Sequence, residues 1–110
     1  MTNINHDEFI SAIHNLNLVQ VRFQSADDGG AILTRICAPM DYGPSRKFKD
    51  GIDRYHVWDF DSDSGKPHTL SLNPIQIVSF EVLEDEFDPS SFVTWPSNWI
   101  VPRGTWGEHN

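Results

Sequence analysis

The sequence predicts a mainly β fold, a small five-stranded barrel with an N-terminal α-helix and an irregular, tryptophan-rich C-terminal tail. Five segments between Val19 and Leu83 have the alternating apolar and polar residues, or the β-branched and aromatic clusters, that are typical of strands. Clusters of Gly, Pro, Asn and Asp separate them, and one segment near the N-terminus has helical spacing. Such short strands form either a strongly bent barrel or an open antiparallel sheet backed by the helix, and we favour the barrel.

The helix is predicted over residues 5–16. Its apolar residues recur at spacings of three and four and form one stripe: Phe9, Ile10, Ile13 and Leu16. Asn3 or Asn5 can cap its start. A helix of about ten residues is unstable alone, so we expect its stripe to dock on the sheet.

The first predicted strand covers residues 19–24, and the turn signal at 27–30 leads into a returning strand over 31–38 that ends at Pro39. Residues 40–53 break the pattern and predict a loop. Four of the chain's eight basic residues fall in or beside this loop: Arg46, Lys47, Lys49 and Arg54. Grouped charge on a loop is common in binding elements, and a solvated loop is the plainer interpretation.

Residues 55–60 predict the third strand, 61–67 a turn, and 68–72 the fourth strand. Residues 73–75 predict a single helical turn, because Asn can cap it and Pro suits its first position. The last strand is expected over 77–83, with these side chains on one face: Val78, Phe80 and Val82.

The C-terminal part divides into an acidic stretch at 84–88, a short turn at 89–92, and a proline-broken segment over 93–110. We therefore expect a domain over 1–92 and a C-terminal extension over 93–110. The extension holds three of the four tryptophans: Trp95, Trp99 and Trp106. It either wraps its own barrel, which we favour because exposed aromatics are costly, or docks on a partner.

Composition limits the function classes. Sixteen Asp and Glu against eight Lys and Arg give a net charge of -8, which disfavours non-specific binding to nucleic acid and to anionic membranes. No apolar stretch nears the roughly 18 residues of a membrane span, and no secretory signal opens the chain. A cytoplasmic location is the resulting expectation. Cys37 is the single cysteine, so an internal disulfide is excluded.

Motifs for catalysis and metal binding are weak. Residues 59–65 loosely resemble a calcium loop, but the glycine falls one position late and a hairpin turn explains the segment better. The histidines have no metal-ligand spacing, and Cys37 lies mid-strand, where cysteine is usually a core residue. We expect no metal, no cofactor and no enzymatic activity. His56 and His68 fall on neighbouring strands, where they would line a pocket or lie on the surface.

The order of these segments resembles that of WYL domains. Residues 33–39 resemble the family's arginine-containing strand before a proline, and 55–61 its name-giving strand, with Tyr55, His56 and Val57 at the Trp, Tyr and Leu positions. Residues 68–75 and 77–82 resemble the last two strands, and 87–89 their exit. The resemblance spans about Phe9 to Phe92.

The resemblance implies an Sm-like small barrel, a bacterial-type regulatory role, and recognition of a negatively charged ligand such as a nucleotide or oligonucleotide. His68, Ser71 and Pro74 stand where the family has basic residues. We expect a ligand site of five residues: Arg35, Tyr55, His56, His68 and Ser71. Histidines there would strengthen binding of an anion at acidic pH. The alternative is a protein-interaction or homo-oligomer module that uses the acidic surface and these aromatics: Trp95, Trp99 and Trp106.

Overall fold

The computed structural model describes residues 6–25, 29–45, 49–60 and 68–110. It contains one α-helix, five strands and three 3-10 turns in these ranges, so the mainly β prediction with an N-terminal helix is confirmed. The elements follow in the order α1 (His6–Asn15), β1 (Asn17–Gln24), β2 (Ile32–Pro44), β3 (Asp53–Asp59), β4 (His68–Leu72), η1 (Pro74–Gln76), β5 (Ile77–Glu86), η2 (Pro89–Ser91) and η3 (Gly107–His109).

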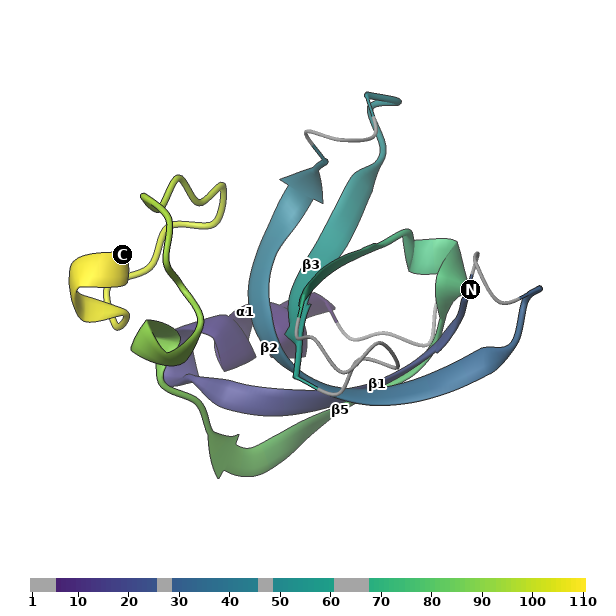
Figure 1. Cartoon of the computed structure of the whole chain (residues 1–110), viewed down its shortest axis with the longest axis horizontal. Helices are drawn as coiled ribbons and strands as arrows, with labels where there is room; N and C mark the ends of the chain where they lie inside the picture. Colours follow the sequence, from purple (N-terminus) through teal and green to yellow (C-terminus); the bar gives the residue numbers. More distant parts are fainter. Residues whose placement is uncertain (1–5, 26–28, 46–48, 61–67) are drawn as a thin grey trace.

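The five strands form one antiparallel sheet in the order β4-β3-β2-β1-β5. The closed barrel predicted from the sequence is wrong, because β4 and β5 are the two edges of the described sheet and do not pair with each other. The three-residue turn η1 leads from one edge to the other instead of forming a hairpin. Figure 1 shows the sheet bending sharply along β2, with α1 behind the bend. The open sheet backed by a helix, our alternative, describes the fold.

β2 is longer than predicted, because Pro39 does not end it. Pro39 pairs with Val57 and Asp41 pairs with His56, so Met40 is an extra residue in a β-bulge. Proline has no N–H to donate, and a bulge is one of the places where a strand tolerates that loss. The predicted loop is therefore wrong for its first five residues, which continue the strand to Pro44.

The core lies between α1 and the sheet. α1 contacts β1, β2 and β5. It buries Phe9 and Ile13 of the predicted stripe together with Ala12, whereas Ile10 and Leu16 are only partly buried. The alternation predicted for β1 is also confirmed, because the three apolar side chains of the predicted face are buried: Val19, Val21 and Phe23.

β5 departs from its predicted alternation at its start. Arg22 pairs with Ser79 and Phe23 pairs with Ile77, so Val78 is a bulged residue. The bulge places Ile77 in the core, where the sequence pattern predicts Val78. The predicted turn before β5 is confirmed, because the Asn73 side chain accepts a hydrogen bond from the Ile75 N–H and caps η1.

The C-terminal segment, residues 93–110, lies beside the sheet (Figure 1). Val93 and Trp106 belong to the same core as Phe9, and Trp58 of β3 stacks on Phe92 with ring centroids 5.3 Å apart. In the part of the chain that the structure describes, no helix is long and apolar enough to cross a membrane.

Several predictions concern residues outside the described ranges. These are the caps at Asn3 and Asn5, part of the turn at 27–30, most of the basic cluster at 46–49, and the turn at 61–67 with its calcium-like motif.

Candidate functional site

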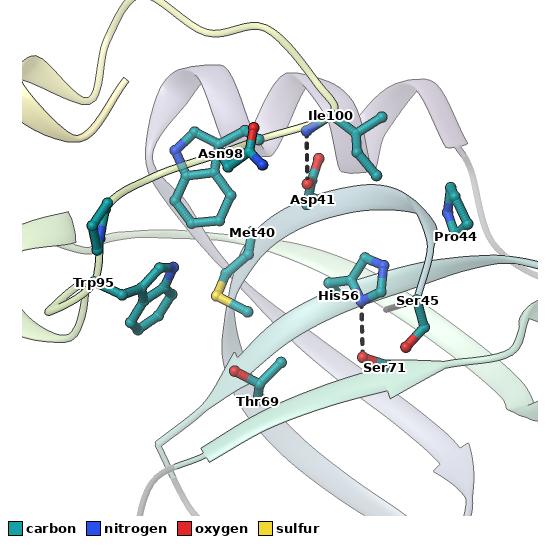
Figure 2. Close-up of a pocket in the computed structure, with 12 residues that line it drawn as sticks. Met40, Asp41, Pro44, Ser45, His56, Thr69, Ser71, Trp95, Asn98 and Ile100 are labelled. Carbon is teal, nitrogen blue, oxygen red and sulfur yellow. Dashed lines mark hydrogen bonds between the residues drawn. The ribbon is translucent and has the colours of Figure 1, made fainter. Parts of the chain in front are cut away.

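A pocket of about 490 Å³ opens between the second half of β2, strands β3 and β4, and the C-terminal segment (Figure 2). One end has aromatic and apolar walls, and the other end has hydroxyl groups and an imidazole. The lining residues are Met40, Asp41, Pro44, Ser45, His56, Thr69, Ser71, Trp95, Pro96, Asn98, Trp99 and Ile100.

His56 and Ser71 form the polar centre of the pocket (Figure 2). They are ladder partners on β3 and β4, which places both side chains on one face of the sheet. The His56 Nδ1 lies 2.8 Å from the Ser71 Oγ, and its Nε2 lies 3.0 Å from the carbonyl oxygen of Gly43.

These two contacts fix the direction of the hydrogen bonds around His56. The Gly43 carbonyl can only accept, so Nε2 carries the proton that it donates. On the neutral ring, Nδ1 is then an acceptor and the Ser71 hydroxyl donates to it. The remaining lone pairs of the Ser71 oxygen are left to accept a hydrogen bond from a ligand.

The local backbone explains why the pocket forms here. The bulge at Met40 sets Asp41 opposite His56 and brings both to the pocket. Gly43 has φ +153°, and a Cβ there would stand 2.5 Å from the Ile100 Cδ1. Only glycine therefore lets Ile100 pack this closely against β2.

Asp41 holds the C-terminal segment in place. Its carboxylate accepts hydrogen bonds from the backbone N–H groups of Ile100 and Val101, both at 2.9 Å, and of Tyr42 at 3.0 Å. Arg103 adds an ion pair at 3.6 Å. Both carboxylate oxygens of Asp41 are therefore bonded within the fold. Asp41 fixes the shape of the pocket rather than offering a free anion to a ligand.

Arg103 packs against two tryptophan rings that meet edge to face. Its guanidinium carbon is 4.3 Å from the ring centroid of Trp99 and 4.4 Å from that of Trp106. Burial lowers the pKa of Arg103 to about 10, and the neighbouring Asp41 opposes that shift. Its Nη1 has no hydrogen-bond partner among the described residues.

Of the five predicted ligand residues, the structure brings two together, His56 and Ser71. Arg35 lies away from the pocket lining and pairs with the buried Asp59, with Nε 3.6 Å from Oδ2. His68 is the ladder partner of that same Asp59. Arg35 and His68 therefore both lie beside Asp59, at a second place on the sheet that is outside the pocket.

Tyr55 is in neither place, because it is a core residue with 5% of its surface exposed. Its hydroxyl is 2.9 Å from the His6 Nδ1, and its ring packs on Phe9. Burial, followed by the neighbouring Tyr42, raises the pKa of Tyr55 above its usual value.

The three tryptophans of the C-terminal segment differ in role. Trp106 is buried, and its Nε1 donates to the carbonyl of Ile13 at 2.8 Å. Trp99 lines the pocket while its Nε1 donates to the carbonyl of His109 at 2.6 Å. Trp95 also lines the pocket and is 37% exposed, so it is the ring most open to a ligand.

Sequence reasoning missed several lining residues, among them Met40, Asp41 and Asn98. Met40 and Asp41 fall where the sequence predicts a loop, and Asn98 lies in an irregular segment without periodicity. The neighbouring turn residues Tyr42, Gly43 and Pro44 gave no signal of a strand. Their roles depend on contacts between segments about 60 residues apart, which local patterns do not encode.

The chemistry of the lining is neutral. It includes no Lys or Arg among the described residues, and its single carboxylate is already bonded. Within the described ranges, no three His, Cys, Asp or Glu side chains gather closely enough to hold a metal ion. No model of a known protein family matches the sequence, and a search of curated proteins finds no match.

Proposed function

We propose that the chain is a non-enzymatic binding module whose pocket takes a planar heteroaromatic group, such as the base of a nucleotide. The observation that carries this proposal is the position of Trp95 and Trp99 beside the hydrogen-bonded His56–Ser71 pair. Tryptophan faces stack on bases at about 1–3 kcal/mol each. A hydroxyl oxygen fixed as an acceptor then reads an N–H at the edge of the base.

The phosphate of such a ligand is the weaker part of its recognition. No Lys or Arg lines the described pocket, and the chain carries a net charge of -8. We therefore place the base inside the pocket and any phosphate at its mouth. A nucleoside and its monophosphate should bind with similar affinity.

The proposal extends to the family suggested by the sequence. We infer a WYL-type module with a regulatory role in the cytoplasm, and the order of the elements supports the WYL-type assignment: one helix, then five strongly bent antiparallel strands in an open sheet. Arg35 and Tyr55 lie outside the pocket, so the ligand site that we propose differs from the one that the resemblance implies.

Binding is tested by titrating ¹⁵N-labelled protein with each of the four common nucleosides and their monophosphates. We expect shifts in the amides of Ser71, Asn98 and Ile100 for at least one base. Ser71→Ala should weaken that binding about fivefold to tenfold, the value of one hydrogen bond. Ser79→Ala, on β5 and outside the pocket lining, is the matched control and should bind like wild type.

Two results would contradict the proposal. One is the absence of pocket shifts for every base at millimolar concentration. The other is covalent labelling of Ser71 by a fluorophosphonate, because that reaction would make the His56–Ser71 pair a nucleophile and its base.

A further inference from the structure

A second hollow, of about 540 Å³, lies away from the pocket described above and shares none of its lining residues. Its walls are apolar: Leu18, Ile36, Phe60 and Phe87. Two carboxylates, Glu86 and Asp88, line it as well. We call it the acidic-rimmed groove.

The sheet places two of these walls on its outer face. Val19 and Cys37 are ladder partners and are fully buried. Side chains alternate along a strand, so their neighbours Leu18 and Ile36 point to the opposite face. Ile36 keeps 40% of its surface exposed as a result.

The remaining walls come from segments that follow strands. Phe60 follows β3 and is 39% exposed, and Phe87 follows β5 and is buried. Exposed apolar residues gathered at a hollow with a polar rim are typical of a protein-interaction site, whereas scattered ones need no explanation.

The charge beside the groove limits what can occupy it. Glu86 and Asp88 line it, and Glu84 and Asp85 lie exposed next to them at the end of β5. A second copy seated here by two-fold symmetry would bring this acidic rim against itself. A nucleic acid would meet the same repulsion.

We propose that the acidic-rimmed groove binds a segment of a partner protein that inserts one large apolar side chain with lysine or arginine on either side. The apolar side chain of the partner covers Ile36 and Phe60, and its lysine or arginine side chains pair with Glu86 and Asp88. This function is separate from the pocket, so each can fail without the other.

The test uses a capped hexapeptide, Gly-Lys-Lys-Leu-Lys-Gly, titrated into ¹⁵N-labelled full-length protein. Matched peptides replace either the lysines with glutamates or the leucine with serine. We expect the lysine–leucine peptide to shift the amides of Ile36 and Phe87 and to bind at least tenfold more tightly than both matched peptides.

Ile36→Ser should weaken binding of this peptide about tenfold, because it removes an apolar wall. Ile32→Ser is the matched control: it lies on the same strand and is 48% exposed, but it does not line the groove. Glu86→Lys should also weaken binding, whereas Glu84→Lys, outside the lining, should weaken it less.

Three outcomes would overturn the proposal. Equal binding of the glutamate peptide would mean that the rim selects nothing. Equal losses in Ile32→Ser and Ile36→Ser would mean general apolar adhesion. Concentration-dependent dimerisation that Ile36→Ser abolishes would make a second copy the occupant.

Discussion

Two Asp–Arg pairs in this protein differ in geometry and in setting. Asp50, which precedes β3, and Arg54, near the start of β3, form two hydrogen bonds of 2.9 Å; the Asp50 side chain is 41% exposed, whereas that of Arg54 is buried. Asp41 and Arg103 are 3.6 Å apart, yet the Arg103 side chain is fully buried against two tryptophans. The closer pair is the one whose carboxylate is open to screening by water and salt.

We expect the segments that a pair joins and the burial of its carboxylate to matter more for stability than the distance between the charges. Asp50 pairs with a residue only four positions away in the same segment, so we expect its loss to leave the fold intact. Asp41 joins β2 to backbone groups of Ile100 and Val101, about 60 residues away, and so fixes one wall of the pocket. We expect the two regions to differ sharply when either is disrupted.

The largest effect should come from Trp106→Ala, which removes a buried ring that packs on Arg103 beside Asp41. Trp106 is 3% exposed, packs on Phe87 and Arg103, and donates to Ile13. Removing a buried Trp costs about 3–5 kcal/mol of the free energy of unfolding. Urea denaturation followed by circular dichroism measures this loss.

Trp106→Phe is the control for this change. It keeps a ring in the core and removes the N–H donor, so the carbonyl of Ile13 loses its partner. We expect a smaller loss, about 1–3 kcal/mol. Equal stability of Trp106→Ala and wild type would mean that the segment does not pack on its own sheet.

Asp41→Ala should have the next largest effect, about 2–4 kcal/mol, because it leaves the N–H groups of Ile100 and Val101 without an acceptor and Arg103 without its ion pair. The pocket wall should loosen at the same time, which faster hydrogen exchange at both amides would report. Asp53→Ala, at the exposed start of β3, is the matched control. Identical exchange in the two variants would show that Asp41 holds nothing.

The sequence predicts well those parts of the fold that local patterns determine. Alternation places Val19 and Val21 in the core, and the Asn73-Pro74 dipeptide predicts the turn before β5. The prediction fails at Pro39: proline usually ends a strand, but here it lies beside a bulge and the strand continues. Barrel closure also fails, since alternation shows which face is buried but not whether two edge strands meet.

The candidate site is predictable only in part, for the same reason. His56 and Ser71 fall on strands expected to be neighbours, so their pairing follows from the register. Arg35 has the expected chemistry for an anion, but the fold commits it to Asp59. Asp41 becomes important only once the distant residues 100 and 101 reach it.

Trp95→Ala should separate stability from binding. Trp95 is 37% exposed, so its loss should lower the free energy of unfolding by about 1 kcal/mol or less. It should nonetheless weaken binding of the base by about 1–3 kcal/mol, the value of one stacked ring. Isothermal titration and urea denaturation on the same sample test both parts. A large loss of stability would instead assign Trp95 to the core.

The smallest effect on the fold should come from the Asp50–Arg54 pair, which joins residues of one segment and has an exposed carboxylate. Hydrogen bonds from Arg54, then from the Ile52 N–H, hold the pKa of Asp50 at about 2, against an ordinary value of 3.8. A carboxyl with a lowered folded pKa stabilises the fold above pH 3.8, and this contribution is lost as the pH falls towards 2. Arg54→Gln should raise the pKa of Asp50 towards 3.8 and flatten this dependence, while the Tm at pH 7 changes little. Carboxyl ¹³C titration by NMR measures the pKa. If Arg54→Gln instead lowered the Tm as much as Asp41→Ala, then neither the exposure of the carboxylate nor the segments that a pair joins would distinguish the two pairs.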